Sequence, residues 1–108
     1  MTQSDLVNLL ANVITDLDGA LMSAQLLSDP PTWQLVYALR KHLDDQQRDL
    51  LKAVLEEENQ AYGALTATIL AASTDLDQVI GDMQHIDNIV KDVASISAAV
   101  DQVLNLVP

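Results

Sequence analysis

A stripe of apolar residues, spaced alternately three and four apart, runs down the last third of the chain. Steps of three and four average 3.5 residues, so a helix with this pattern keeps one seam against a neighbouring helix along its whole length. The pattern therefore predicts an all-α fold built from long amphipathic helices. A single polar residue, Ser97, interrupts the stripe, which consists of Leu76, Val79, Met83, Ile86, Val90, Val93, Ser97, Val100, Leu104 and Val107.

The amino-acid composition also favours an all-helical fold, and it restricts which side chains can form the core. The 108 residues include three Gly and three Pro, which are too few for the turns of an all-β protein. Phe and Cys are absent, so the core is expected to consist of Leu, Ile, Val and Ala, without disulfides or thiolate metal sites. The length is that of one domain, and we expect residues 1–108 to form a single helical bundle.

The first helix is predicted near Ser4–Ser28. Thr2 or Ser4 can cap its start, with Asp5 in the first turn. The sequence Asp29-Pro30-Pro31 ends it, because proline lacks the donor that a helix interior needs.

A middle helix is predicted near Thr32–Ser73, although Asp44 to Asp49 contains no apolar residue. A fresh helix could start there, but without Gly or Pro to mark a break a continuous helix is favoured. Its apolar face continues in phase with the final stripe, which would also permit one helix from Leu51 to Val107. A turn at Ser73-Thr74-Asp75 is favoured instead, because these residues prefer helix caps.

The last helix is predicted near Asp75–Val107. Its apolar face covers three positions in seven, which suits a bundle of three or four helices better than a two-stranded coil. We therefore expect an antiparallel bundle of three long amphipathic helices, or four, with coiled-coil-like packing. Helix content should be about 85%.

The formal net charge is −11, with 16 acidic and five basic residues. Such a surface repels phosphate, so we expect neither nucleic-acid binding nor attachment to anionic membranes. Crowded carboxylates should also raise one another's pKa values on average. The first residues, Met1 to Asp5, lack the basic residue with which a signal peptide begins. The apolar stretch Ala64 to Ala72 is too short to span a membrane. A cytoplasmic protein is therefore expected.

Catalytic motifs are not recognisable, and we expect no enzyme activity and no cofactor. His42 and His85 each stand three residues from an aspartate, Asp45 and Asp82, as in bundle metal sites. Each histidine also immediately precedes a core position, which predicts a place at the rim of the bundle. A ligand- or metal-binding bundle using His42 and His85 is therefore the alternative hypothesis.

The leading hypothesis is a non-enzymatic interaction protein, an adaptor or chaperone-like bundle that binds another polypeptide in an apolar groove with an acidic rim. If the middle helix is longer than the first, part of its apolar face lacks a partner within the chain, which predicts a homodimer. Glu58 falls among apolar positions of that face, which indicates exposure or a shift in register. The candidate interface is Leu51, Leu55, Glu58, Tyr62, Leu65 and Ile69.

Overall fold

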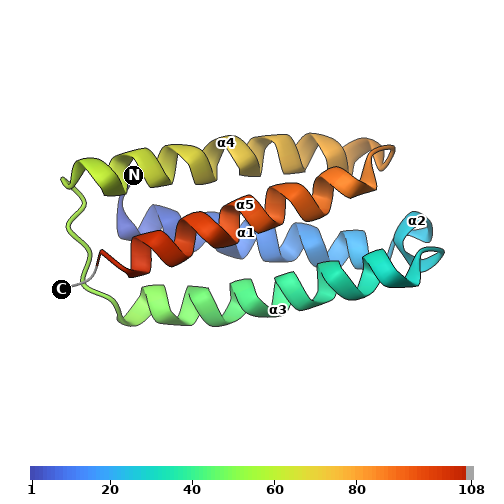
Figure 1. Ribbon diagram of the computed structural model, residues 1–108, viewed down its shortest axis with the longest axis horizontal. Helices are drawn as coiled ribbons and strands as arrows, with labels where there is room; N and C mark the ends of the chain where they lie inside the picture. The colour runs from blue at the N-terminus through green and yellow to red at the C-terminus, as the bar shows by residue number, and fades with distance from the viewer. Residues whose placement is uncertain (107–108) are drawn as a thin grey trace.

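Five helices account for 83% of the structure, a computed structural model that describes residues 1–106 (Figure 1). None of these residues forms a strand. The predicted all-α class is therefore confirmed, while the number of helices differs from the prediction. The helices are α1 (Gln3–Leu21), α2 (Ala24–Leu27), α3 (Pro30–Lys52), α4 (Gln60–Asp82) and α5 (Ile86–Leu104).

Side-chain caps define where three of the long helices begin. Thr2 and Asp5 form a reciprocal capping box at the start of α1, as the sequence predicted. Asp29 caps α3 and is followed by Pro30, whose fixed backbone angle suits a first helical turn. The Asn59 side chain accepts hydrogen bonds from Ala61 N and Tyr62 N at the start of α4.

The four long helices form a bundle with principal extents of 43 × 21 × 17 Å. Around the bundle the order of neighbours is α1, α3, α5, α4, and α4 packs most extensively against α5. Successive long helices run in opposite directions, so the neighbours α1 and α4 are parallel, as are α3 and α5 (Figure 1). The segment 53–59 therefore crosses between diagonal helices.

The core is aliphatic, as expected from a chain without Phe. Apolar side chains at three- and four-residue spacing on all four long helices are buried, and the final stripe supplies Val93, Val100 and neighbouring residues to this core. Val107, the last residue of that stripe and the predicted end of the last helix, lies outside the described residues.

The predicted helix Thr32–Ser73 is wrong, because the chain leaves helical geometry after Lys52 and resumes it at Gln60. The break is stabilised from the first helix. Gln3 Nε2 donates to the carbonyls of Leu50 (2.6 Å) and Ala53 (2.8 Å), and Gln3 N donates to Glu57 Oε1. These contacts satisfy carbonyls at the end of α3 and hold the acidic loop in place.

The predicted turn at Ser73-Thr74-Asp75 is also wrong, because α4 continues through it to Asp82. Thr74 stays helical by donating its hydroxyl to Leu70 O. The chain turns instead after Met83, which takes the left-handed conformation (φ 54°), while Asp82 Oδ1 accepts from Gln84 N. The first predicted helix is likewise interrupted, at Met22 and Ser23, before the short α2.

The predicted continuity of the helix through Asp44 to Asp49 is confirmed, and Gln46 explains why this stretch needs no apolar residue. Gln46 occupies the core position and is buried against α5. Its Nε2 donates to Ser97 O (2.9 Å) and Asp101 Oδ1 (2.7 Å), and Ser97 Oγ donates to Gln46 Oε1 (3.2 Å). Gln46 and Ser97, which both interrupt apolar patterns, are therefore hydrogen-bond partners.

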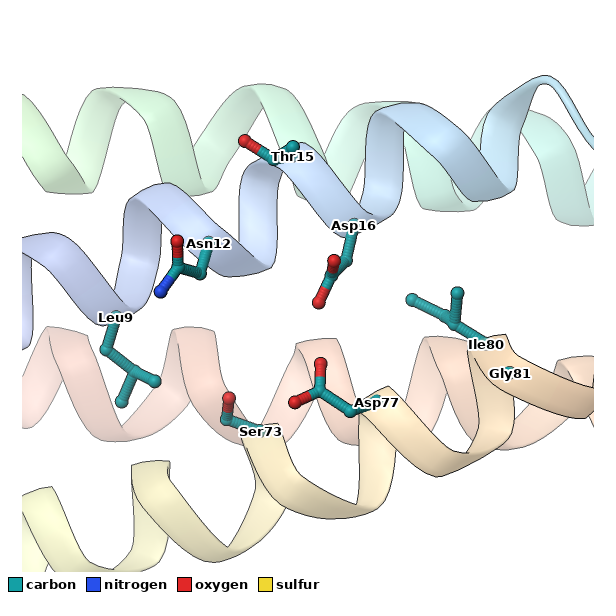
Figure 2. A pocket seen from close by; sticks show the side chains of 8 residues that line it. All are labelled: Leu9, Asn12, Thr15, Asp16, Ser73, Asp77, Ile80 and Gly81. Atoms are coloured by element: carbon teal, nitrogen blue, oxygen red, sulfur yellow. The ribbon is translucent and has the colours of Figure 1, made fainter.

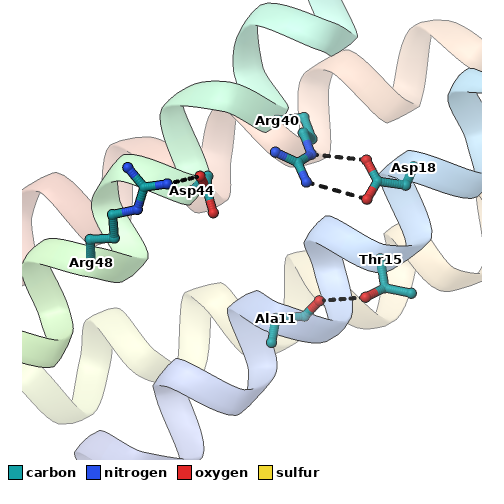
Figure 3. Close-up of polar contacts among 6 residues, drawn as sticks. All are labelled: Ala11, Thr15, Asp18, Arg40, Asp44 and Arg48. Atoms are coloured by element: carbon teal, nitrogen blue, oxygen red, sulfur yellow. Dashed lines mark hydrogen bonds and ion pairs between the residues drawn. The ribbon is translucent and has the colours of Figure 1, made fainter.

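Ion pairs lie on the outer side of α3 (Figure 3). Arg40 forms two hydrogen bonds to Asp18 of α1, with Nε 2.9 Å from Oδ1, and Arg48 bonds Asp44 one turn earlier in α3. Both pairs are solvent-exposed, so each contributes little to stability. Within the described chain, no helix combines the length and the apolar character that crossing a membrane requires.

We predict that Gln46→Ala destabilises the protein by about 2–3 kcal/mol, because it leaves a void and strands the Ser97 hydroxyl in an apolar core. The double variant Gln46→Leu/Ser97→Ala should recover most of this loss, since both polar groups are removed together. Urea unfolding measures both effects. Gln34→Ala, an exposed glutamine of the same helix, is the control, and equal losses for the two Ala variants would contradict the role of the buried pair.

Candidate functional site

The structure does not bring the six candidate interface residues onto one surface. Tyr62 and Ile69 are buried in the core of the chain, and Leu55 and Leu65 pack against that core. Glu58 is exposed in the loop between α3 and α4. Leu51, at the end of α3, is the one large apolar side chain of the six that is mostly exposed (65%). The break at residues 53–59 is the reason, because it turns α4 back into the bundle.

Leu51 borders a groove of about 390 Å³ between α1 and the end of α3. The α1 side of this α1–α3 groove is formed by Gln3, Ser4, Val7 and Asn8. Val54, three residues beyond Leu51, is 77% exposed. After Leu55 come the exposed glutamates 56–58, and the hydrogen bond from Gln3 N to Glu57 holds this acidic loop against α1.

A larger groove, of about 520 Å³, opens between the parallel helices α1 and α4 (Figure 2). This α1–α4 groove follows the least extensively packed of the four contacts between long helices. Asp16 from α1 and Asp77 from α4 point toward each other across it (Figure 2). The lining residues are Leu9, Asn12, Thr15, Asp16, Ser73, Asp77, Ile80 and Gly81.

Asp16 and Asp77 share a proton more readily than two isolated carboxyls would. A hydrogen bond to Asp77, partial burial and the charge of Asp77 raise the pKa of Asp16 from 3.8 to about 6. No basic side chain offsets these charges locally, because α1 and α4 each contain three Asp and no Lys, Arg or His. The α1–α4 groove is therefore strongly anionic at neutral pH.

A second pair of carboxylates joins α4 to α5. Asp92 is 8% exposed, and its Oδ2 has no hydrogen-bond partner among the described residues. Burial first, then hydrogen bonding to Asp75 and the charge of Asp75, raise the pKa of Asp92 to about 6, against the opposing effect of Lys91. Helix α4 is thus flanked by a carboxylate pair on each of two sides.

The two histidines of the alternative hypothesis lie far apart. His42 Nε2 is 4.0 Å from Asp101 Oδ1 near the end of α5, whereas His85 immediately precedes the start of that helix. Sixteen residues of helix separate the two places, which is about 24 Å. Among the residues that the structure describes, no three His, Asp or Glu side chains converge to hold a metal ion.

The sequence did not single out Asp16, Ser73 or Asp77, because their proximity depends on the parallel packing of α1 against α4. One signal was present: Asp16 and Asp77 each lie next to a core position, Leu17 and Leu76, on helices without a basic residue. Ser73 was interpreted as a cap residue, whereas it lies in mid-helix and faces the groove.

No protein-family model, curated protein or solved structure matches this chain. The two grooves and the charges around them are therefore the features of the molecule that indicate a function.

We predict that the melting temperature increases as the pH falls from 7.5 to 5. Asp16 and Asp92 have folded-state pKa values near 6, above the unfolded value of 3.8, so the native state binds more protons in this window. Their stabilising contribution is lost as the pH rises through 6. Asp5 has a lowered pKa because of hydrogen bonds to Thr2, and its opposite effect falls below this window.

Asp16→Asn should raise the melting temperature at pH 7.5 and reduce its pH dependence, because it removes one charge of a facing pair. After screening by water the gain is on the order of 1 kcal/mol, or several degrees. Calorimetric melts across this pH range test the prediction. Asp49→Asn removes the same charge from an exposed position of α3 and is the control; an equal effect of the two variants would show that only net charge matters.

Proposed function

We propose that the protein is a non-enzymatic interaction module that binds a basic, amphipathic segment of another polypeptide in the α1–α3 groove. The observation that carries the proposal is the exposure of Leu51 and Val54 beside an acidic loop that is fixed to α1. Apolar side chains exposed in this way are typical of interaction surfaces when polar residues surround them.

The apolar part of the groove supplies a hydrophobic contact. Val7 lies partly buried in the groove, Leu51 lines it from the end of α3, and Val54 is exposed in the segment that follows. An amphipathic helix could place one or two apolar side chains here, as in other helix-in-groove complexes. Covering side chains of this size contributes about 1–2 kcal/mol each.

The charges around the groove favour a basic partner. Glu56, Glu57 and Glu58 are all exposed at the loop, and Asp5 is exposed on the adjoining turn of α1. Lys52 is the basic residue nearest to them in the sequence. Complementary charge of this kind increases the association rate and selects against acidic partners.

The homodimer expected from the sequence is a competing occupant of the same groove. The homodimer was expected because part of the apolar face of the predicted middle helix would lack a partner within the chain. Tyr62 and Ile69 of that face are buried within the chain. Leu51 and Val54 alone expose less apolar surface than a stable dimer interface requires. The net charge of −11 also opposes close approach of two copies.

A peptide titration tests the proposal. The probe is an 18-residue helical peptide with Leu at helical spacing and Lys at the other positions, and fluorescence anisotropy reports its Kd. Leu51→Ser/Val54→Ser should weaken binding by about 30-fold or more, since two apolar contacts of about 1–2 kcal/mol each are lost. Glu56→Gln/Glu58→Gln should weaken it a few-fold and reduce its salt dependence.

Met22→Ser/Leu35→Ser, which removes two exposed apolar side chains away from this groove, is the matched control and should leave the Kd unchanged. Equal binding of a Leu/Glu peptide, or equal weakening by the control, would overturn the proposal. Sedimentation equilibrium that shows a dimer dissociated by Leu51→Ser/Val54→Ser would assign the groove to a second copy of the chain instead.

A further inference from the structure

The α1–α4 groove combines acceptors for a cationic group with an apolar surface. Asp16 and Asp77 contribute carboxylates from opposite sides, and Leu9 and Ile80 contribute aliphatic side chains (Figure 2). This groove is separate from the α1–α3 groove, which lies along the other side of α1 and contains none of these residues.

Ser73 gives an independent indication of a ligand. Its side chain lines the groove although the residue is only 5% exposed, and its hydroxyl forms no hydrogen bond with any described residue. Thr68 and Thr74 of the same helix behave differently, because each donates to the carbonyl four residues earlier. The Ser73 hydroxyl oxygen is not among the buried atoms that lack a partner, so it is open to the groove and can bond a group bound there.

The Thr15 hydroxyl donates to Ala11 O within α1 and points away from Asp77 (Figures 2 and 3). The acceptors that face one another at the middle of the groove are Asp16, Asp77 and Ser73 (Figure 2). Three acceptors match an alkylammonium group, which has three N–H donors and no acceptor.

The size of the groove favours an organic cation over a metal ion. A volume of about 520 Å³ lies in the range of small-molecule sites and greatly exceeds that of one ion. Two carboxylates are also fewer charged ligands than calcium sites usually contain, and no three metal-ligating side chains converge in the described residues.

We propose that the α1–α4 groove binds a primary alkylammonium group. The ammonium donates to Asp16, Asp77 and the Ser73 hydroxyl, while the attached methylene chain extends toward Leu9 (Figure 2). Asn12, one turn before Asp16, is placed to receive a second polar group. The charge of the ligand replaces repulsion between the two carboxylates with attraction to both.

The same chemistry has two sources, a free aliphatic polyamine and a lysine side chain of a partner polypeptide. Both present an ammonium on a chain of methylenes. A free diamine carries a second ammonium, whereas a lysine side chain is attached to a neutral backbone.

Thermal melts at pH 7.5 and constant ionic strength test this site. With a Kd of about 1 mM, about 10 mM 1,5-diaminopentane should raise the melting temperature by about 5 °C. Tetramethylammonium, which has no N–H donor, should raise it by less than about 1 °C. N-acetyl-lysine amide in place of the diamine distinguishes the sources, since a stronger effect of the lysine derivative points to a partner's side chain.

Asp16→Asn/Asp77→Asn should abolish the diamine effect, and Ser73→Ala should reduce it about threefold in apparent affinity. Asp49→Asn/Asp87→Asn removes the same charge from α3 and α5, and should preserve the effect. Because removing the facing charges stabilises the chain, the groove variant is expected to remain folded.

Equal shifts with tetramethylammonium, or a diamine shift that persists in the groove variant, would overturn the proposal by reducing it to charge screening. A shift with Ca²⁺ but not with the amines would overturn it in favour of a metal site. Amide chemical-shift changes confined to residues near Ser73 and Asp77 during the diamine titration would support it.

Discussion

One buried polar contact, between Gln46 and Ser97, fixes the register between the parallel helices α3 and α5. Each residue interrupts an otherwise apolar pattern, and each satisfies the other. Sliding one helix past the other by a turn would leave two polar groups unpaired among Leu and Val side chains, at a cost of several kcal/mol. The aliphatic core alone would accept several registers, because Leu, Ile and Val of similar size are easily exchanged.

This arrangement determines which helices lie side by side, and therefore where a groove can open on the surface of the bundle. With α3 and α5 parallel, α4 must return along the diagonal and lie beside α1, also in parallel (Figure 1). Helices α1 and α4 both lack basic residues, so their contact brings Asp16 and Asp77 together without a cation between them. The repulsion is consistent with the loose packing of this pair and with the groove that opens there.

The sequence predicted the all-α class, but it did not predict the number of helices or most of their ends. Local signals sufficed where one segment determines its own structure, as in the capping box of Thr2 and Asp5. They failed where a distant residue decides, since the end of α3 depends on Gln3, some 50 residues earlier in the sequence. The Met83 turn was missed for another reason: a left-handed methionine carries no glycine signal, and the apolar stripe continues through it.

The candidate sites were predictable only in part, for the same reason. Leu51 was identified from its position in the apolar pattern of the predicted middle helix. Tyr62 and Ile69 belong to the same pattern, but they are buried because α4 turns back into the bundle, which the sequence did not reveal. Asp16, Ser73 and Asp77 come together through packing between helices that are about 60 residues apart in the chain. Periodicity assigns faces to helices, whereas contacts between particular faces depend on the topology of the whole bundle.

The parallel arrangement of α3 and α5 can be measured directly by double electron–electron resonance. The chain has no native Cys, so spin labels can be attached at exposed positions 35 and 52 of α3 and 91 and 102 of α5. A parallel pair predicts that distances 35–91 and 52–102 are shorter than 35–102 and 52–91 by roughly 10 Å or more. The opposite order, with 35–102 the short distance, would mean that the two helices are antiparallel and would contradict the fold described for this protein.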